Sequence, residues 1–310
     1  MIRNKQLSLS LGILASLCWG LSFIWYKTAY LGFGPLTVVV LRLVIASVVL
    51  GLTAIVTNQR VVIARKDWKY FLLLAVFEPF LYFLGESFGM KYVSSTLGAL
   101  IIATIPLFTP IPAYILYKEK VQVTGFIGLA LSFAGVGLVV WQGGFDVVNY
   151  WGIPLMLLAV LSAVCYGLVL KKLSHTYSSI TIVRTQSILG LIMFLPLFFI
   201  FEWKDFNYHA PVNAWLAVIA LAVFASCVAY MCISIAIRNL GVNKTNLLAN
   251  LIPVFTAITA YLFLHEAFGL PKIVGGIMVL SGVLLFEFGW NGWAEGQKAG
   301  RQEGRERESS

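Results

Sequence analysis

The sequence contains very little charge. Only 11% of its 310 residues are Asp, Glu, Lys or Arg, while 60% are hydrophobic. Soluble domains average about 25% charged and 45–50% apolar residues. A single core surrounded by water could not bury so much apolar surface, so the composition excludes an ordinary soluble domain, a disordered chain and a coiled coil. The mean hydropathy of +0.89 indicates that much of the chain lies in hydrocarbon.

Cysteine and histidine are also scarce, with four and three residues. Their spacings match no zinc, haem or redox motif. The sequence has no P-loop, no Gly-rich nucleotide motif and no convincing Ser/His/Asp or Cys/His arrangement. We therefore expect no metal site and no cofactor. We also expect that the protein is not an enzyme and that the chain alone is not an ATP-driven pump.

Ten apolar runs each have the roughly 20 residues that a membrane-spanning helix needs. They cover residues 7–27, 35–57, 69–90, 95–117, 121–142, 150–171, 179–201, 213–237, 244–264 and 269–290. The first run follows Arg3 and Lys5 as a signal peptide would, but it continues to Trp25, so we interpret it as a retained span. The connectors are too short for a soluble domain. We expect residues 291–310, rich in Gly, Glu and Arg, to form a disordered cytoplasmic tail.

The basic residues predict the orientation of these spans. The net charge is +9, but the basic residues lie in short stretches between apolar runs, which indicates topology and not a nucleic-acid partner. If the N-terminus is cytoplasmic, sixteen of the 22 Lys and Arg residues fall on the cytoplasmic side and four outside. Cytoplasmic loops are enriched in Lys and Arg. We therefore predict a multi-pass protein of the plasma (inner) membrane with both termini in the cytoplasm.

The two halves of the chain repeat with a shift of 147 residues. This shift aligns residues 105–109 (IPLFT) with 252–256 (IPVFT), Glu119 with Glu266, and Gly128 and Gly135 with Gly275 and Gly282. We place one repeat at 1–145 and the other at 146–290. Each repeat has five spans, an odd number, so the second is inserted upside down. Inverted repeats are typical of alternating-access transporters, whose substrate site lies near the midplane at the repeat interface.

These residues resemble the EamA family of the drug/metabolite transporter superfamily. In the first half the resemblance is carried by Trp19-Gly20, Arg42, the IPLFTP stretch at 105–110, Tyr114, Glu119, Gly128 and Gly135. In the second half it is carried by Tyr166-Gly167, Arg184, Pro253, Glu266, Gly275 and Gly282. It extends to about residue 290. It implies an all-α membrane fold of ten helices, with the first, third, sixth and eighth spans around a central cavity.

Charged residues inside spans are the first candidates for a site, because each costs about 2.5–3.5 kcal/mol to insert. With a rise of 1.5 Å per residue, Arg42 and Glu86 lie roughly 6 and 9 Å outward of the middle of their spans. We expect these two to pair, either as a structural salt bridge or in binding an anionic group. Glu78, Tyr82 and Glu86 are four residues apart and would share a helix face. Glu78 is a candidate either for a cavity-lining proton carrier or for a member of a buried polar network.

The remaining candidates lie mainly in the second half. Arg184 lies at the depth of Asn246 and Asn250; it could reach the cytoplasmic interface, pair with Glu287, or hold a substrate carboxylate with the two asparagines. The deep aromatic residues Trp19, Tyr166 and Tyr230 either line the cavity or pack against other helices. Pro106 and Pro253 occupy equivalent positions and are either hinges or static kinks. The paired glycines predict a close helix–helix seam.

Together these features predict a secondary transporter, and we expect an exporter, of small polar or amphipathic metabolites such as amino acids. Its partners would be a small-molecule substrate, the lipid bilayer and, in a coupled mechanism, protons. One alternative is an exchanger of anionic or phosphorylated metabolites, which would need several cationic groups in the cavity. Others are a membrane enzyme acting on lipid and a non-transporting membrane protein. The sequence indicates no oligomeric state.

Overall fold

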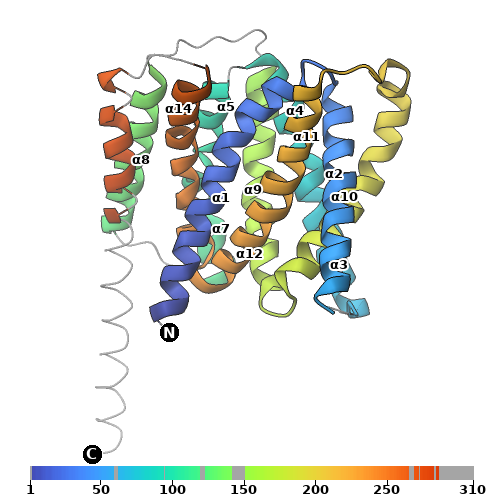
Figure 1. The fold of residues 1–310 in the computed structure, drawn as a ribbon. Coiled ribbons are helices and arrows are strands. Elements are labelled where there is room, and N and C mark those ends of the chain that lie inside the picture. Colours follow the sequence, from blue (N-terminus) through green and yellow to red (C-terminus); the bar gives the residue numbers. More distant parts are fainter. Residues whose placement is uncertain are drawn as a thin grey trace, which may run out of the picture.

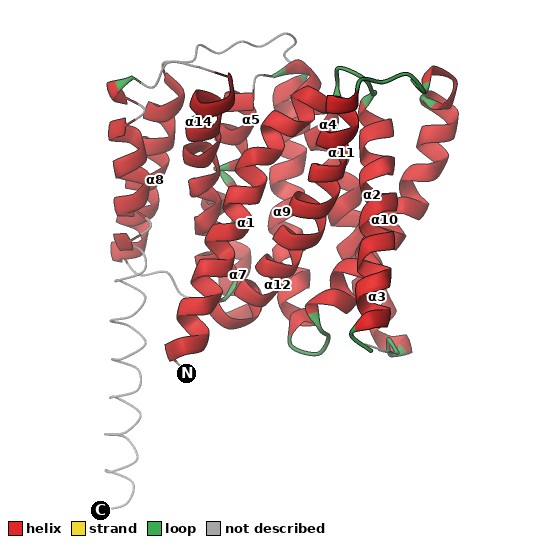
Figure 2. Ribbon diagram, in the orientation of Figure 1, coloured by secondary structure: helices red, strands yellow, loops and turns green. Residues whose placement is uncertain are grey.

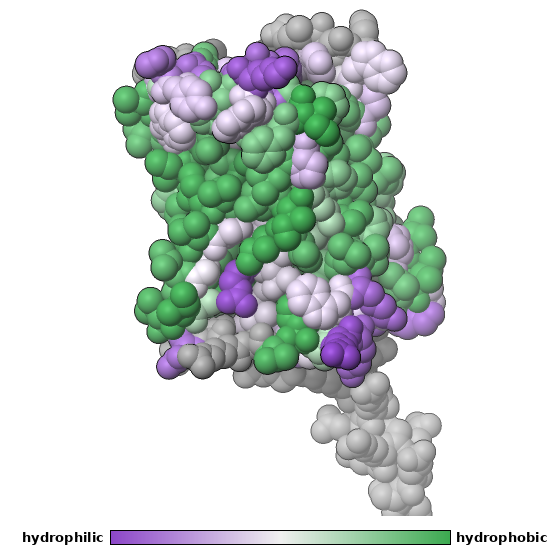
Figure 3. Space-filling model, turned by 90° about the vertical axis from the view of Figure 1, so that its right-hand side faces the viewer, coloured by the Kyte–Doolittle hydropathy of each residue, from purple (hydrophilic) through white to green (hydrophobic). Residues whose placement is uncertain are grey.

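The computed structural model describes residues 2–58, 62–93, 95–118, 123–141, 151–264, 269–271, 273–282 and 284–285. Within these ranges the regular elements are helices that lie side by side in one bundle (Figures 1 and 2). A hydrophobic band crosses the middle of the face shown in Figure 3, and most hydrophilic residues gather above and below it. The arrangement is that of a membrane-embedded helical bundle.

In the part of the chain that the structure describes, six helical segments are apolar and long enough to cross a membrane. Three lie in the first half: α1 (Ile2–Ala29), α2 (Pro35–Val56) and a segment from Arg65 to Tyr92 that contains η1 (Arg65–Asp67), α3 (Trp68–Ala75), η2 (Val76–Leu81) and α4 (Tyr82–Tyr92). The other three are α9 (Gly152–Ser174), α10 (Ser179–Phe201) and a segment from Val212 to Leu240 containing α11 (Val212–Ala220), η4 (Leu221–Val228) and α12 (Ala229–Leu240). They correspond to six of the ten predicted spans.

Two of the other predicted spans are not continuous helices. Residues 95–117 form α5 (Ser95–Ile102), α6 (Ile105–Phe108) and α7 (Pro110–Tyr117). Residues 244–264 lie in α13 (Val242–Leu247), the 3-10 turn η5 (Leu248–Asn250) and α14 (Leu251–Leu264). In each case the helix is interrupted just before a proline. Proline has no amide hydrogen, so it cannot donate a hydrogen bond to the carbonyl group four residues earlier. The two remaining runs contain shorter apolar helices at Val123–Gly135, within α8 (Val123–Trp141), and at Ile273–Gly282.

Two of the long segments contain a π-helical stretch in the middle, η2 and η4. In η2, Glu78 departs from helical geometry altogether, with φ −149° and ψ 118°, directly before Pro79. Such stretches widen the helix and leave backbone groups outside the regular ladder, and they are frequent at functional sites. The third predicted span is therefore interrupted at the residue that carries its deepest carboxylate.

The helices pack in a consistent set of pairs. α1 packs against α12 and α14, α4 packs against α9, and α2 packs against α10. α8 and the helix at Ile273–Gly282 approach closely: a Cβ atom at Gly135 would lie 2.6 Å from the carbonyl oxygen of Gly275, and one at Gly282 would meet the carbonyl oxygen of Gly128. The predicted glycine seam is thus present between these two helices. Large side chains such as Phe23, Leu43 and Phe194 fill the core.

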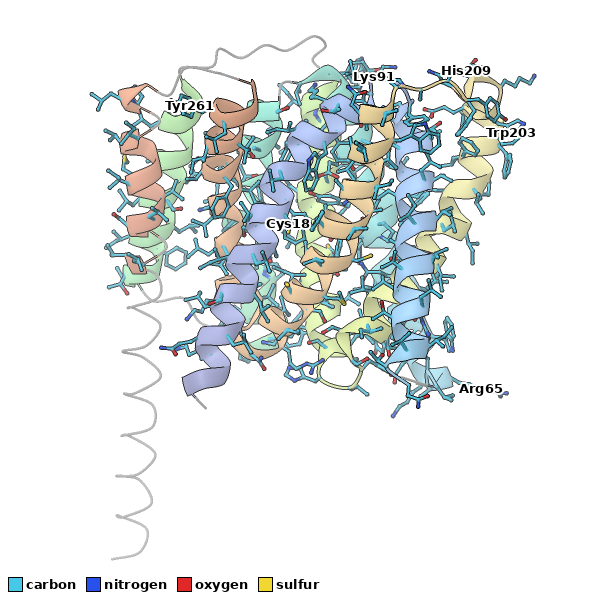
Figure 4. All side chains as sticks on the ribbon, viewed as in Figure 1. Cys18, Arg65, Lys91, Trp203, His209 and Tyr261 are labelled. Atoms are coloured by element: carbon cyan, nitrogen blue, oxygen red, sulfur yellow. The ribbon has the colours of Figure 1, made fainter. Side chains whose placement is uncertain are left out.

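Residues labelled in Figure 4 mark the two ends of the bundle. Arg65 lies at the end that holds the N-terminus, whereas Lys91, Trp203 and His209 lie at the opposite end (Figure 4). At the N-terminal end, the Tyr177 hydroxyl donates a 2.7 Å hydrogen bond to Asp67. This bond to a carboxylate raises the pKa of Tyr177 above its ordinary value and ties the turn after α9 to the segment before α3.

Candidate functional site

A central cavity lies inside the bundle and extends toward the N-terminal end. Its volume is about 50 Å³, enough for a few water molecules. Residues from α1, η2, α9 and α12 form its walls, together with residues of α13 and η5, which follow α12 after Gly241. Its lining is mostly apolar and consists of Trp19, Glu78, Tyr82, Ile102, Ile105, Ala163, Tyr166, Gly167, Ile233, Ile237, Thr245, Asn246, Ala249 and Ile252.

Three aromatic rings meet beside this cavity. Tyr230 packs edge-on against Trp19 and Tyr166, with ring centroids 5.7 and 5.9 Å apart. The Trp19 Nε1 donates to the carbonyl oxygen of Ala225 in the π-helical η4, and the Tyr166 hydroxyl donates to Gln186 Oε1. These two hydrogen bonds fix the orientation of the Trp19 and Tyr166 side chains. Of the predicted aromatic residues, Trp19 and Tyr166 line the cavity, while Tyr230 lies behind them.

Glu78 is the acidic residue among the described residues of the cavity wall. Its side chain is buried, with 5% of the residue exposed, and its carboxylate accepts a hydrogen bond from the Tyr230 hydroxyl. The expected stack of Glu78, Tyr82 and Glu86 on one helix face is only partly present. Tyr82 donates to Glu86 at 3.1 Å, but Glu78 lies in the non-helical part of η2 and bonds across the bundle to α12. The interruption of the helix at Pro79 removes Glu78 from the regular four-residue spacing.

Arg42 and Glu86 belong to a separate polar network, formed by Tyr26, Arg42, Tyr82, Glu86 and Ser226. Arg42 Nη1 lies 3.7 Å from Glu86 Oε2 and donates to the Tyr26 hydroxyl at 2.6 Å, while its Nε donates to Ser226. The Tyr26 hydroxyl in turn donates to Glu86 Oε2 at 2.8 Å. The guanidinium also stacks on the Phe83 ring, 4.2 Å from its centroid. The pairing expected from span depth is therefore present.

The polar network joins α1, α2, α4 and η4, and both of its charged residues are buried. Of its members, only Tyr82 is also part of the cavity lining. Arg42 is satisfied by hydroxyl groups and a carboxylate, as a buried charge must be. The network therefore joins four elements beside the cavity.

The other predicted residues do not form one group. Arg184 is half-buried on α10 outside the cavity lining, and it makes no hydrogen bond or ion pair with the part of the chain that the structure describes. Its expected partner Glu287 lies outside the described residues. Asn246 lines the cavity and donates to Thr109 at 3.0 Å, whereas Asn250 is fully buried and donates to Ser132 of α8 at 2.7 Å. The two asparagines therefore point to different helices, and the expected carboxylate clamp with Arg184 is not assembled.

A second, basic pocket of about 280 Å³ lies at the N-terminal end of the bundle. It is lined by Lys5, Lys171, His175, Arg238, Asn239, Leu240, Gly241 and Lys244. Arg238 and Lys244 are next in sequence to Ile237 and Thr245 of the central cavity, so the two hollows are neighbours. This concentration of Lys and Arg lies at the end where the sequence predicts the cytoplasm.

Sequence patterns alone do not single out Tyr26, Ser226, Gln186 or Thr245. The first two satisfy Arg42, Gln186 anchors Tyr166, and Thr245 lines the cavity. Each is a neutral polar residue within or beside an apolar run. A neutral polar residue costs less free energy to insert into a membrane than a charged residue does, so it does not stand out in the sequence. The partners of these residues also lie far away in the sequence.

The fold and cavity define the protein as a polytopic helical membrane protein with a polar group buried at its centre. The model of the EamA-like transporter family matches residues 6–141 and again 150–288. The chain belongs to this family. The resemblance seen in the sequence is confirmed, and so is the general class of membrane transporter.

Relatives with similar sequences are also named as transporters. The protein "Uncharacterized transporter YdfC" of Bacillus subtilis is 25% identical over 285 residues, 91% of this chain and 90% of the relative. "Uncharacterized transporter YyaM" of the same organism is 28% identical over 205 residues, 63% of this chain and 65% of the relative. A crystal structure of a protein with 14% identity has a TM-score of 0.77, covering 92% of this chain and 99% of that one, and supports the fold alone.

Proposed function

We propose that this protein is a secondary transporter that moves small polar or amphipathic metabolites, such as amino acids, by alternating access. The observation that carries the proposal is the central cavity, which places a buried carboxylate and aromatic walls between helices of both halves of the chain. The polar network of Arg42 and Glu86 packs the helices beside it. Such a site suits a solute that is bound inside the bundle and released after the helices rearrange.

We further propose ten spans arranged as two inverted repeats, at 1–145 and 146–290. Three observations support this arrangement. The family model matches the chain twice. With the shift of 147 residues, the packing of α1 on α12 is equivalent to that of α9 on α4, and both pairs are present. The same shift moves the π-helical η2 from 76–81 to 223–228, within η4.

The glycine seam agrees with the same two-fold relation. The shift converts Gly128 into Gly275 and Gly135 into Gly282. In the structure Gly128 faces Gly282, and Gly135 faces Gly275. Exchanging the two repeats therefore converts one contact into the other, as expected for two helices related by a pseudo-two-fold axis.

The breaks before Pro106 and Pro253 are the proposed hinges. These prolines cannot donate to the carbonyl groups of Ile102 and Ala249, four residues earlier, and both of those residues line the cavity. Bending there would widen or close the cavity without breaking a regular helical hydrogen bond. The rearrangement would also change the hydrogen bond from Arg42 to Ser226, which is the bond of the polar network that crosses between the two halves.

We propose that the N-terminal end of the bundle faces the cytoplasm of a cell whose plasma (inner) membrane contains the protein. The basic residues at that end, including those of the basic pocket, support this orientation. A cavity that extends toward this end would load substrate from inside, so the transporter would act as an exporter. Glu78 is the proposed proton carrier, because a buried carboxylate that alternates between the two sides can bind and release a proton.

Transport is tested by reconstituting the purified protein into proteoliposomes and measuring uptake from a metabolite mixture. Ala163→Trp would fill the cavity and should abolish the uptake that the wild type shows. Leu161→Trp on the same helix is the matched control, because Leu161 is 54% exposed on the outer surface and should tolerate the change. Uptake equal to that of empty liposomes, or unaffected by Ala163→Trp, would refute the proposal.

A further inference from the structure

We infer that the basic pocket at the N-terminal end of the bundle binds a phosphate group, carried either by the headgroup of an anionic lipid or by a soluble phosphate ester. This second ligand site is separate from the central cavity, so the inference does not rest on the proposed function. The volume of about 280 Å³ lies just below the ~300–1,000 Å³ that is typical of small-molecule sites. It therefore has room for a phosphate group with a small substituent.

The lining of the pocket is strongly positive. Three lysines and one arginine line it, and none of its described lining residues is Asp or Glu. The four cations are far apart in the sequence and come from α1, α9, α12 and α13, in the order Lys5, Lys171, Arg238 and Lys244. Ammonium and guanidinium groups that converge in this way are the donors that recognise phosphate oxygens. Basic pockets between membrane helices on the cytoplasmic side also bind phosphate-bearing lipid headgroups.

The backbone at Gly241 brings two of these cations to the same pocket. Gly241 has φ 87°, a conformation that residues with a side chain rarely adopt, and it forms the turn between α12 and α13. Its N–H donates to the carbonyl oxygen of Ile237 at 3.0 Å, and its own carbonyl accepts from the Thr245 hydroxyl at 2.7 Å. The turn therefore places Arg238 before it and Lys244 after it around one hollow.

Neutral groups hold two of the cations in position. Arg238 Nη2 donates to the carbonyl oxygen of Tyr177 at 2.9 Å, and Lys171 Nζ lies 4.7 Å from the centroid of the Tyr117 ring. Neither contact neutralises the positive charge. The Nε of Arg238 is buried and makes no hydrogen bond with the described residues, which is costly for a donor. A small rotation of this side chain toward a phosphate oxygen in the pocket would satisfy it.

Membrane orientation alone does not explain this pocket. Lys and Arg gather on the cytoplasmic side of membrane proteins, and the helix dipole favours the cations in the last turns of α9 and α12. Lysines with only that role can stay in water, as the exposed Lys66 and Lys69 do. Lys244, in contrast, is only 3% exposed, and the Lys5 side chain lies beside it. An anion in the pocket would offset the repulsion between these two like charges.

The soluble form of the ligand is tested by calorimetry on the full-length protein in phosphatidylcholine nanodiscs at pH 7. Glycerol 3-phosphate is expected to bind, and glycerol, its neutral counterpart, is not. Lys5→Gln/Lys171→Gln should weaken binding of the phosphate at least about tenfold, because hydrogen bonds from charged groups are lost. Lys66→Gln/Lys69→Gln is the matched control: it removes two exposed positive charges outside the pocket lining and should leave the affinity unchanged.

The lipid form is tested by native mass spectrometry of the protein released from nanodiscs that contain equal amounts of phosphatidylglycerol and phosphatidylcholine. The wild type and the control variant are expected to retain phosphatidylglycerol in preference, and Lys5→Gln/Lys171→Gln is expected to lose this preference. Retention of phosphatidylglycerol without binding of glycerol 3-phosphate would assign the site to a lipid. The opposite pair of results would assign it to a soluble ester.

A wild-type protein that neither binds glycerol 3-phosphate more tightly than glycerol nor prefers phosphatidylglycerol would overturn the inference. Equal losses in the two double variants would also overturn it, because the charges would then act only through the general field of that end. The wild-type comparisons decide the question even if Lys5→Gln/Lys171→Gln does not fold. Because the experiment measures binding at the basic pocket and not flux, its failure leaves the proposed transport standing.

Discussion

The contact between Arg42 and Glu86 allows a quantitative prediction. With 3.7 Å between Nη1 and Oε2, the Coulomb attraction is about 4.5 kcal/mol at an effective dielectric constant of 20. Desolvation of the two buried charges offsets much of this gain, but removing one partner leaves the other charge uncompensated. We therefore expect Arg42→Met and Glu86→Gln each to lower the free energy of unfolding by about 3–5 kcal/mol.

The double variant Arg42→Met/Glu86→Gln measures the interaction energy between the two side chains. Its loss of stability should be smaller than the sum of the two single losses by about 2–3 kcal/mol, because neither charge then remains alone. Glu86→Gln retains an acceptor for the hydroxyl groups of Tyr26 and Tyr82, so the cycle reports mainly on charge. The free energies are measured by reversible unfolding in mixed micelles. Losses that add to within about 0.5 kcal/mol would show that the two side chains do not interact.

Glu78→Gln should give a folded protein whose transport no longer responds to a pH gradient; unchanged pH dependence would make Glu78 a structural residue. Gly135→Ala should lower the melting temperature, since its Cβ would lie 2.6 Å from a backbone oxygen, whereas Gly137→Ala, with no atom within 4 Å, should not; equal effects would refute the seam. Single cysteines at the exposed Asn58 and His209 should react with impermeant maleimide from the cytoplasmic and the outer side respectively, and the reversed result would contradict the orientation.

Much of the fold could be predicted because a membrane-spanning helix needs only a long apolar run. α1, α2, α9 and α10 follow such runs closely. The interruptions at Pro106 and Pro253 were less predictable. Proline indicates that a helix is disturbed, but whether the result is a bend, as expected, or separate short helices depends on the neighbouring helices.

Part of the site could also be predicted from the sequence. Charges inside spans are costly, so Arg42, Glu78 and Glu86 stand out, and depth along the helix pairs two of them. The direction of Glu78 could not be predicted, because the spacing of four residues holds only in a continuous α-helix and η2 interrupts it. The different partners of Asn246 and Asn250 could not be predicted for a related reason: Asn250 lies in the 3-10 turn η5, where the angle per residue differs from that of an α-helix.

Alternating access is the central claim, and the accessibility of one cavity residue tests it most directly. A single cysteine at Ala163, with the four native cysteines replaced by serine, is exposed to an impermeant thiol reagent from either side of oriented proteoliposomes. Alternating access predicts reaction from both sides, with the faster rate from the N-terminal side, toward which the cavity extends. A cysteine at Leu161, on the outer surface of the same helix, should remain unreactive within the bilayer. Reaction of the Ala163 cysteine from one side only, under all conditions that support transport, would contradict the account.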